Sequence, residues 1–180
     1  MGGFPLACNA VIKEFFIKRR FRKLFKNSLS PQVTDKLVDQ ILNGSIPDKP
    51  ELKEASIEFV CVSVQGETPE IIAERMAIAS DIAIEHKGMI QDQVSGIIII
   101  TYGILFCEPD DAEQLVNLCQ SLQTKLAGNV KIVYGKAQGH FGNLGSSGRM
   151  SFSFILPSFL DALATLAALP YGEIREFKDK

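Results

Sequence analysis

Residues 135–149 read Gly-Lys-Ala-Gln-Gly-His-Phe-Gly-Asn-Leu-Gly-Ser-Ser-Gly-Arg. Segments of β-type pattern border this run, at residues 130–137 and 149–156, so we expect a glycine loop between two strands. No Lys-Ser or Lys-Thr pair follows the glycines, so the run is not a P-loop. The glycines favour tight turns and close packing. A phosphate cradle made of backbone N–H groups is the alternative.

The rest of the domain alternates between strand and helix patterns. Residues 55–65 are apolar on both faces, as in a central strand. Residues 89–94 and 97–105 predict a hairpin that turns at Ser95-Gly96, and Thr68-Pro69-Glu70 is a helix start. The predicted order is β-α-β-β-α-β-β-α-β. This order indicates an α+β, ferredoxin-like fold with an antiparallel-rich sheet and helices over one face. Its helices are predicted at 68–86, 110–126 and 157–168, and its last strand at 173–177.

The segment before this domain differs in charge. Residues 1–30 hold seven Lys and Arg against one Glu, about +6, in a chain whose net charge is −2. The other residues therefore carry a net charge of about −8. Because nucleic acids are anionic, this charge disfavours a nucleic-acid partner. We expect a basic amphipathic lead helix at 1–27, a short helix and linker at 28–51, and the domain at 52–180. Residues 12–26 could bind an anionic membrane surface, as a juxtamembrane helix would; a solvated helix leading into the domain is the alternative.

The metal-binding residue types are sparse. The chain has two histidines, and its four cysteines form no Cys-x-x-Cys pair, so a zinc site is not expected. Three of the cysteines lie inside predicted apolar segments, as reduced packing thiols do. This usage favours a cytoplasmic protein, or one at the cytoplasmic face of a membrane.

Residues 28–177 resemble the catalytic domains of class III adenylate and guanylate cyclases. The resemblance implies that family's fold, a dimer of α+β domains with active sites at the interface. No single motif is specific, but all occur in the family's order. They are Leu29-Ser-Pro-Gln-Val33, Phe59–Thr68, His86-Lys-Gly88-Met-Ile90, Glu108-Pro-Asp-Asp-Ala112, and Gly142-Asn-Leu-Gly-Ser146 with Arg149.

The family's metal ligands are replaced in this chain. The family converts a nucleoside triphosphate to a 3′,5′-cyclic nucleotide with two metal ions, which two aspartates hold. The resemblance places these aspartates at Ser63, late on the first strand, and at Gly96, in the hairpin turn. A hydroxyl group and a bare backbone cannot replace two anionic ligands of Mg²⁺. We therefore expect no metal cofactor.

The half of the site that faces a partner domain is altered too. The family's transition-state Asn and Arg fall at Leu160 and Ala164, so all four degenerate positions lack their catalytic groups. The purine-contacting Lys falls near Asp92, which reverses the charge. Ser153 keeps a hydrogen-bonding group at the base-contacting position. Nucleotide binding is then vestigial at best, through Ser153, Asp92, Gly142 and Gly145.

These observations favour a non-catalytic cyclase-homology domain, a dimerising signal-transduction module of a larger sensor protein. The expected partner is a second copy or another cyclase-type domain. One alternative is a divergent adenylate cyclase that makes cAMP from ATP, with Mg²⁺ or Mn²⁺ held by the nearby acids Glu67 and Asp92. The other is a regulatory domain that binds a nucleotide or small ligand in the vestigial interface pocket.

Overall fold

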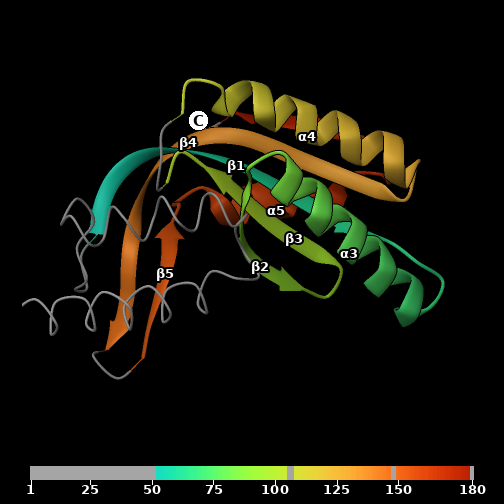
Figure 1. Cartoon of the computed structure of the whole chain (residues 1–180), viewed down its shortest axis with the longest axis horizontal. Coiled ribbons are helices and arrows are strands. Elements are labelled where there is room, and N and C mark those ends of the chain that lie inside the picture. Colours follow the sequence, from blue (N-terminus) through green and yellow to red (C-terminus); the bar gives the residue numbers. More distant parts are fainter. Residues whose placement is uncertain (1–51, 105–107, 147–148, 179–180) are drawn as a thin grey trace, which may run out of the picture. The chain divides into compact units, whose positions relative to one another are not determined.

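The computed structural model describes residues 52–104, 108–146 and 149–178. The predicted lead helix at 1–27 and the segment at 28–51 lie outside them. The described elements follow the predicted order and confirm the α+β fold (Figure 1). They are β1 (Leu52–Val64), α3 (Pro69–Glu85), β2 (Met89–Val94), β3 (Ile97–Tyr102), α4 (Asp111–Leu126), β4 (Val130–Ser146), β5 (Arg149–Ile155), α5 (Phe159–Ala168) and β6 (Ile174–Lys178).

The described strands form one six-stranded sheet. The strand order is β2-β3-β1-β4-β5, and β6 also pairs with β4. The β4–β6 pair is parallel and the other pairs are antiparallel. Strand β1 is central, because it pairs with β3 through Glu58–Ser63 and with β4 along its whole length.

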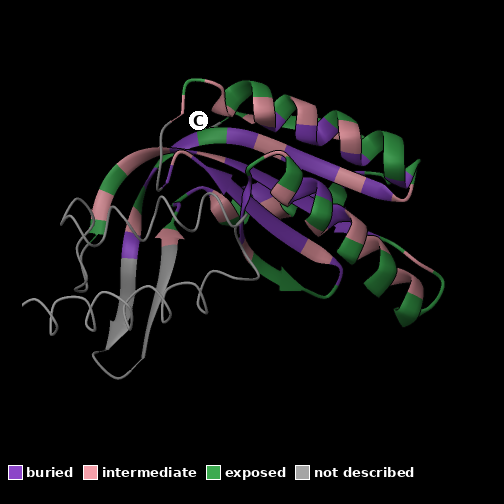
Figure 2. Ribbon diagram, in the orientation of Figure 1, coloured by how far each residue is buried: buried purple, intermediate pink, exposed green. Residues whose placement is uncertain are grey.

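Helices cover both faces of this sheet. On β1, Val60 and Val62 pack in one core with residues of α3 and α4, whereas Ile57 and Phe59 pack in a second core with Ala162 and Leu166 of α5. The second half of β1, Phe59–Val64, is buried throughout (Figure 2). The prediction that the helices cover one face is therefore wrong for α5. A strand that is apolar on both faces needs cover on both.

The glycine run is mostly strand, which corrects the predicted loop. Residues 135–146 continue β4 and pair with β1, β5 and β6. A Cβ atom on Gly135 would lie 2.7 Å from the carbonyl oxygen of Phe177, and one on Gly139 would lie 2.6 Å from that of Ile155. These glycines therefore allow neighbouring segments to approach closely, as the packing interpretation expected.

Local side-chain and backbone chemistry explains where α3 begins after β1 and where the hairpin turns between β2 and β3. The Thr68 hydroxyl accepts a hydrogen bond from the Ile71 backbone N–H at 3.4 Å, and Pro69 opens α3. Ser95 and Gly96 have φ angles of 51° and 79°, as both central residues of a type I′ hairpin turn require. The predicted helix start and hairpin turn are both confirmed.

Candidate functional site

The two positions to which the resemblance assigns the metal-binding aspartates lie side by side. Ser63 of β1 pairs with Ile97, the first residue of β3. The next residue, Val64, donates its backbone N–H to the Gly96 carbonyl oxygen at 2.8 Å. The structure thus brings Ser63 and Gly96 together at one end of the sheet, where the resemblance places them.

Gly96 leaves little room for a side chain. Its φ of 79° lies in the left-handed region, and a Cβ atom there would lie 3.0 Å from the Val64 carbonyl oxygen. A carboxylate at this position would need both a strained backbone and a shift of β1.

Ser63 belongs to a polar cluster with Lys131 and Tyr171, which we call the Ser63 cluster. The Ser63 side chain is buried, and its Oγ lies 3.2 Å from the Tyr171 hydroxyl. Lys131 of β4 sits directly opposite Ser63. The Lys131 ammonium donates to the Ala167 carbonyl oxygen at 3.0 Å and lies 4.9 Å from the centre of the Tyr171 ring.

Sequence reasoning missed Lys131 and Tyr171. A signal for Lys131 exists, because it is a charged residue on the side of β4 that otherwise carries Val133 and Ala137. Tyr171 offers no such signal, since it follows α5 and lies 108 positions from Ser63 in the chain.

The Ser63 cluster does not fit the metal ions that the fold family implies. Its side chains offer a serine hydroxyl, a phenol and an ammonium, whereas Mg²⁺ prefers several anionic or carbonyl oxygens. An ammonium one strand away from Ser63 also repels a divalent cation. Elsewhere in the described part of the chain, no three His, Cys, Asp or Glu side chains are grouped so that they could hold a metal.

The two acids that could serve instead are exposed. Glu67 lies between β1 and α3, and Asp92 lies on β2 next to a bulge. Asp92 Oδ1 accepts a hydrogen bond from the Gln93 backbone N–H at 2.8 Å. No hydrogen bond or ion pair among the described residues joins either acid to the Ser63 cluster.

The positions that the resemblance assigns to the partner-facing half of the site lie on the outer side of α5. Leu160 is 76% exposed and Ala164, one turn later, is exposed as well, whereas Ala162 and Leu166 are buried against the sheet. The two positions at which we expect the family's Asn and Arg thus carry apolar side chains that face away from their own domain.

The proposed nucleotide-contacting positions are divided between the two edges of the sheet. Gly142 of β4 pairs with Ser153 of β5, and Gly145 pairs with Met150. Asp92 lies on β2, at the opposite end of the strand order. Within one chain, the structure brings Gly142 and Ser153 together and leaves Asp92 apart.

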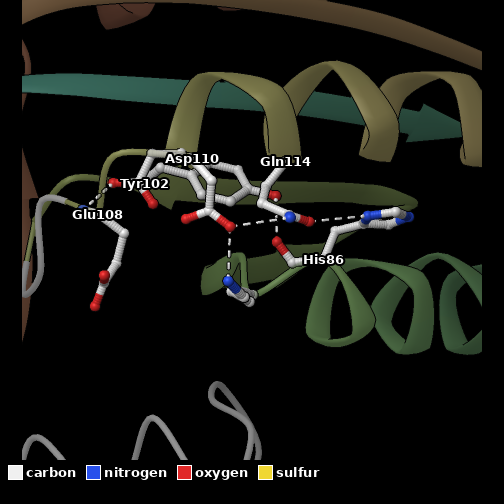
Figure 3. A network of polar contacts seen from close by, with 7 residues as sticks. His86, Tyr102, Glu108, Asp110 and Gln114 are labelled. Carbon is white, nitrogen blue, oxygen red and sulfur yellow. Dashed lines mark hydrogen bonds and ion pairs between the residues drawn. The ribbon is translucent and has the colours of Figure 1, made fainter.

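The motifs around His86 and Glu108 meet in a polar network between α3 and α4 (Figure 3). The Tyr102 hydroxyl donates to the His86 carbonyl oxygen at 3.2 Å, and His86 Nδ1 lies 3.4 Å from Gln114 Oε1. His86 Nε2 lies 3.0 Å from the Ser121 hydroxyl. Each contact joins the end of α3 to β3 or α4, so these residues hold the helices in place.

An ion pair also joins the end of α3 to the start of α4. The Lys87 ammonium lies 2.7 Å from Asp110 Oδ2, and this hydrogen bond lowers the pKa of the Asp110 carboxyl and raises the pKa of Lys87. Burial raises the pKa of the next carboxyl, Asp111, which accepts a hydrogen bond from the Glu108 backbone N–H at 3.0 Å. Burial also raises the pKa of Tyr102.

Two cysteines lie in the cores, one on each face of the sheet. Cys61 and Cys119 are buried free thiols, and burial raises the pKa of each to about 12. Such thiols stay protonated at neutral pH and act as packing groups, as predicted.

Within the described ranges, no helix has the length and apolar character needed to cross a membrane.

No protein-family model matches the sequence, and no curated protein matches it significantly. Solved structures do match. The adenylyl cyclase CyaB from P. aeruginosa has a TM-score of 0.63 and 16% identity over 71% of this chain and 79% of that one. The guanylyl cyclase Cya2 has a TM-score of 0.55 and 16% identity over 69% of this chain and 75% of its own.

A non-canonical dimeric guanylyl cyclase domain from the RhoGC fusion protein of the aquatic fungus Blastocladiella emersonii matches as well. Its TM-score is 0.56, with 12% identity over 69% of this chain and 80% of that one. At such identities the likeness defines the fold. The chain has the catalytic-domain fold of the class III adenylyl and guanylyl cyclases.

Proposed function

We propose that this chain is a non-catalytic cyclase-homology domain, which acts as a dimerising signal-transduction module of a larger sensor protein. The observation that carries the proposal is the Ser63 cluster. At the position that the resemblance assigns to a metal-binding carboxylate, the chain has a buried hydroxyl group, and Lys131 stands directly opposite on β4. Gly96 supplies no second carboxylate, and its turn leaves little space for one.

The chemistry of cyclisation supports this proposal. Transfer of a nucleotidyl group depends on metal ions that activate the nucleophile and neutralise the phosphates. A single lost electrostatic contact in an active site commonly costs about 3 kcal/mol of transition-state stabilisation. This chain lacks the contacts of both halves of the site, at Ser63 and Gly96 and at Leu160 and Ala164.

The outer side of α5 supports a dimerising role. Leu160 is the most exposed of the large apolar side chains among the described residues. With Ala164 it replaces two polar residues that would act on a partner's substrate. An apolar contact between domains needs no substrate, so we infer that α5 faces a second copy or another cyclase-type domain.

The direct test is an assay of ATP and GTP cyclisation with Mg²⁺ and with Mn²⁺. We expect no product above a heat-killed control. Turnover that Asp92→Ala abolishes would instead establish the divergent adenylate cyclase.

A thermal-shift screen with nucleotides tests the ligand-binding alternative. A ligand at 100 times its Kd stabilises a protein by about 2.7 kcal/mol. A nucleotide that shifts the melting temperature in this way would show that the domain keeps a regulatory binding site.

A further inference from the structure

The Ser63 cluster lies where three parts of the chain converge. Ser63 comes from the end of β1, Lys131 from the start of β4 and Tyr171 from the link between α5 and β6. Residues directly opposite each other on antiparallel strands point to the same face, with Cβ atoms about 5 Å apart. The side chains of Ser63 and Lys131 therefore share the α5 face of the sheet.

The Lys131 ammonium is held on this face by two contacts. The first is the Ala167 carbonyl oxygen, at the negative end of the α5 dipole. The second is the Tyr171 ring, at a distance typical of a cation–π contact. These two contacts hold the positive charge of Lys131 near the end of β1.

Tyr171 is held in place by its neighbours. The Gly172 backbone N–H donates to the Val130 carbonyl oxygen at 2.7 Å, and the Gly172 carbonyl oxygen accepts from the Gln123 side chain at 3.2 Å. These bonds fix the link on which Tyr171 stands. Its hydroxyl is thereby kept within hydrogen-bonding distance of Ser63 Oγ.

We propose that Lys131 and Tyr171 have taken over the metal position of the fold. Lys131 brings the positive charge that a cation would otherwise supply beside β1, and Tyr171 brings the hydrogen-bonding partner of residue 63. The end of β1 is thus a closed junction that excludes a divalent cation, rather than an open metal site that lacks its ligands. This inference rests on the proposed non-catalytic function.

The proposal has a specific consequence for a carboxylate reinstated at residue 63. The ammonium of Lys131, the residue directly opposite, would pair with the new charge, and the Tyr171 hydroxyl would donate to it. A carboxylate that is satisfied in this way has little to offer a metal ion. Ser63→Asp should therefore be tolerated because Lys131 is present, and it should create no metal site.

The experiment compares the full chain with the variants Ser63→Asp, Lys131→Gln and the double variant Ser63→Asp/Lys131→Gln. Thermal melting at neutral pH measures stability, and the electron paramagnetic resonance signal of added Mn²⁺ alone measures metal binding. Ser63→Asn and Ser63→Asn/Lys131→Gln are the matched controls, because asparagine has nearly the shape of aspartate without its charge.

We expect Ser63→Asp to melt within about 3 °C of the unchanged chain and to bind no Mn²⁺ at millimolar concentration. The same substitution in the Lys131→Gln background should lower the melting temperature by at least about 6 °C, because the buried carboxylate loses its cation. Ser63→Asn should lower the melting temperature by the same amount whether residue 131 is Lys or Gln.

Two results would overturn the proposal. One is an equal loss of stability from Ser63→Asp with and without Lys131. The other is Mn²⁺ binding by the Ser63→Asp variant, a measurement that stays valid even if Lys131→Gln does not fold. Neither result depends on whether the unchanged chain makes a cyclic nucleotide, so failure of the proposed function is detected separately.

Discussion

The two faces of the sheet differ in what fills them. The face under α3 and α4 holds a continuous apolar core, with the His86 network at the end of the helices. The α5 face has a smaller apolar core bordered by the Ser63 cluster, and the helix that covers it exposes Leu160 on its outer side. Three of the four positions to which the resemblance assigns catalytic groups, Ser63, Leu160 and Ala164, lie on this side of the sheet. The first face therefore holds α3 and α4 in place, whereas the α5 face also carries the candidate site.

The largest expected effect separates a buried leucine from an exposed one. Leu118 of α4 is fully buried in the core of the first face, so Leu118→Ala should cost about 3 kcal/mol of unfolding free energy. Leu160→Ala removes the same atoms from an exposed site and should cost under about 0.5 kcal/mol. Urea denaturation of both variants measures the two losses. Equal losses would show that Leu160 is covered within its own domain.

The second prediction concerns association through α5. Leu160→Glu places a charge in the proposed interface and should weaken self-association at least about tenfold. Sedimentation measures this, and the melting temperature of the monomer should not change. Val116→Glu on α4 is the control, because Val116 is likewise an exposed apolar residue but lies on the other side of the sheet. Equal weakening by the control, or a strictly monomeric unchanged chain, would contradict a homodimer through α5.

The third prediction uses the ion pair between α3 and α4. The folded state lowers the pKa of the Asp110 carboxyl, chiefly through Lys87. The stabilisation from Asp110 is then complete above its unfolded pKa of about 3.9 and is lost as the pH falls through the folded value. Asp110→Asn should therefore lower the melting temperature slightly at neutral pH, and the difference should vanish in acid. A difference that persists below the folded pKa would show that charge is not its cause.

Much of the fold could be read from local pattern. Alternation on both faces of β1 identified a central strand, Thr68-Pro69 located a helix start, and Ser95-Gly96 located the hairpin turn. Each of these features depends on residues close together in the chain. The side of the sheet that α5 covers depends on the whole core, and local pattern did not reveal it.

The candidate site shows the limit of such reasoning. The packing of Gly135 depends on Phe177, and the contact of Ser63 depends on Tyr171, so both require the tertiary fold. The resemblance predicts that catalytic residues are missing at Ser63, Gly96, Leu160 and Ala164, and this stays a prediction. It could not indicate which side chains fill the space, because no local pattern couples β1 to the link after α5.

The smallest expected effect on the folded domain comes from the basic segment that precedes it. We propose that residues 12–26 bind an anionic membrane surface, since this segment holds all seven cations of residues 1–30 and several phenylalanines. Each cation near such a surface contributes about 1 kcal/mol, and salt screens charges beyond roughly 8–10 Å. The full chain should therefore bind phosphatidylserine vesicles less as salt rises. A chain lacking residues 1–27 should lose this binding and still melt cooperatively, because the described cores lie within residues 52–178.

Vesicles of neutral lipid are the control. Binding that survives the truncation would place the membrane contact on the acidic domain, and an unfolded truncation product would show that the segment packs into that domain.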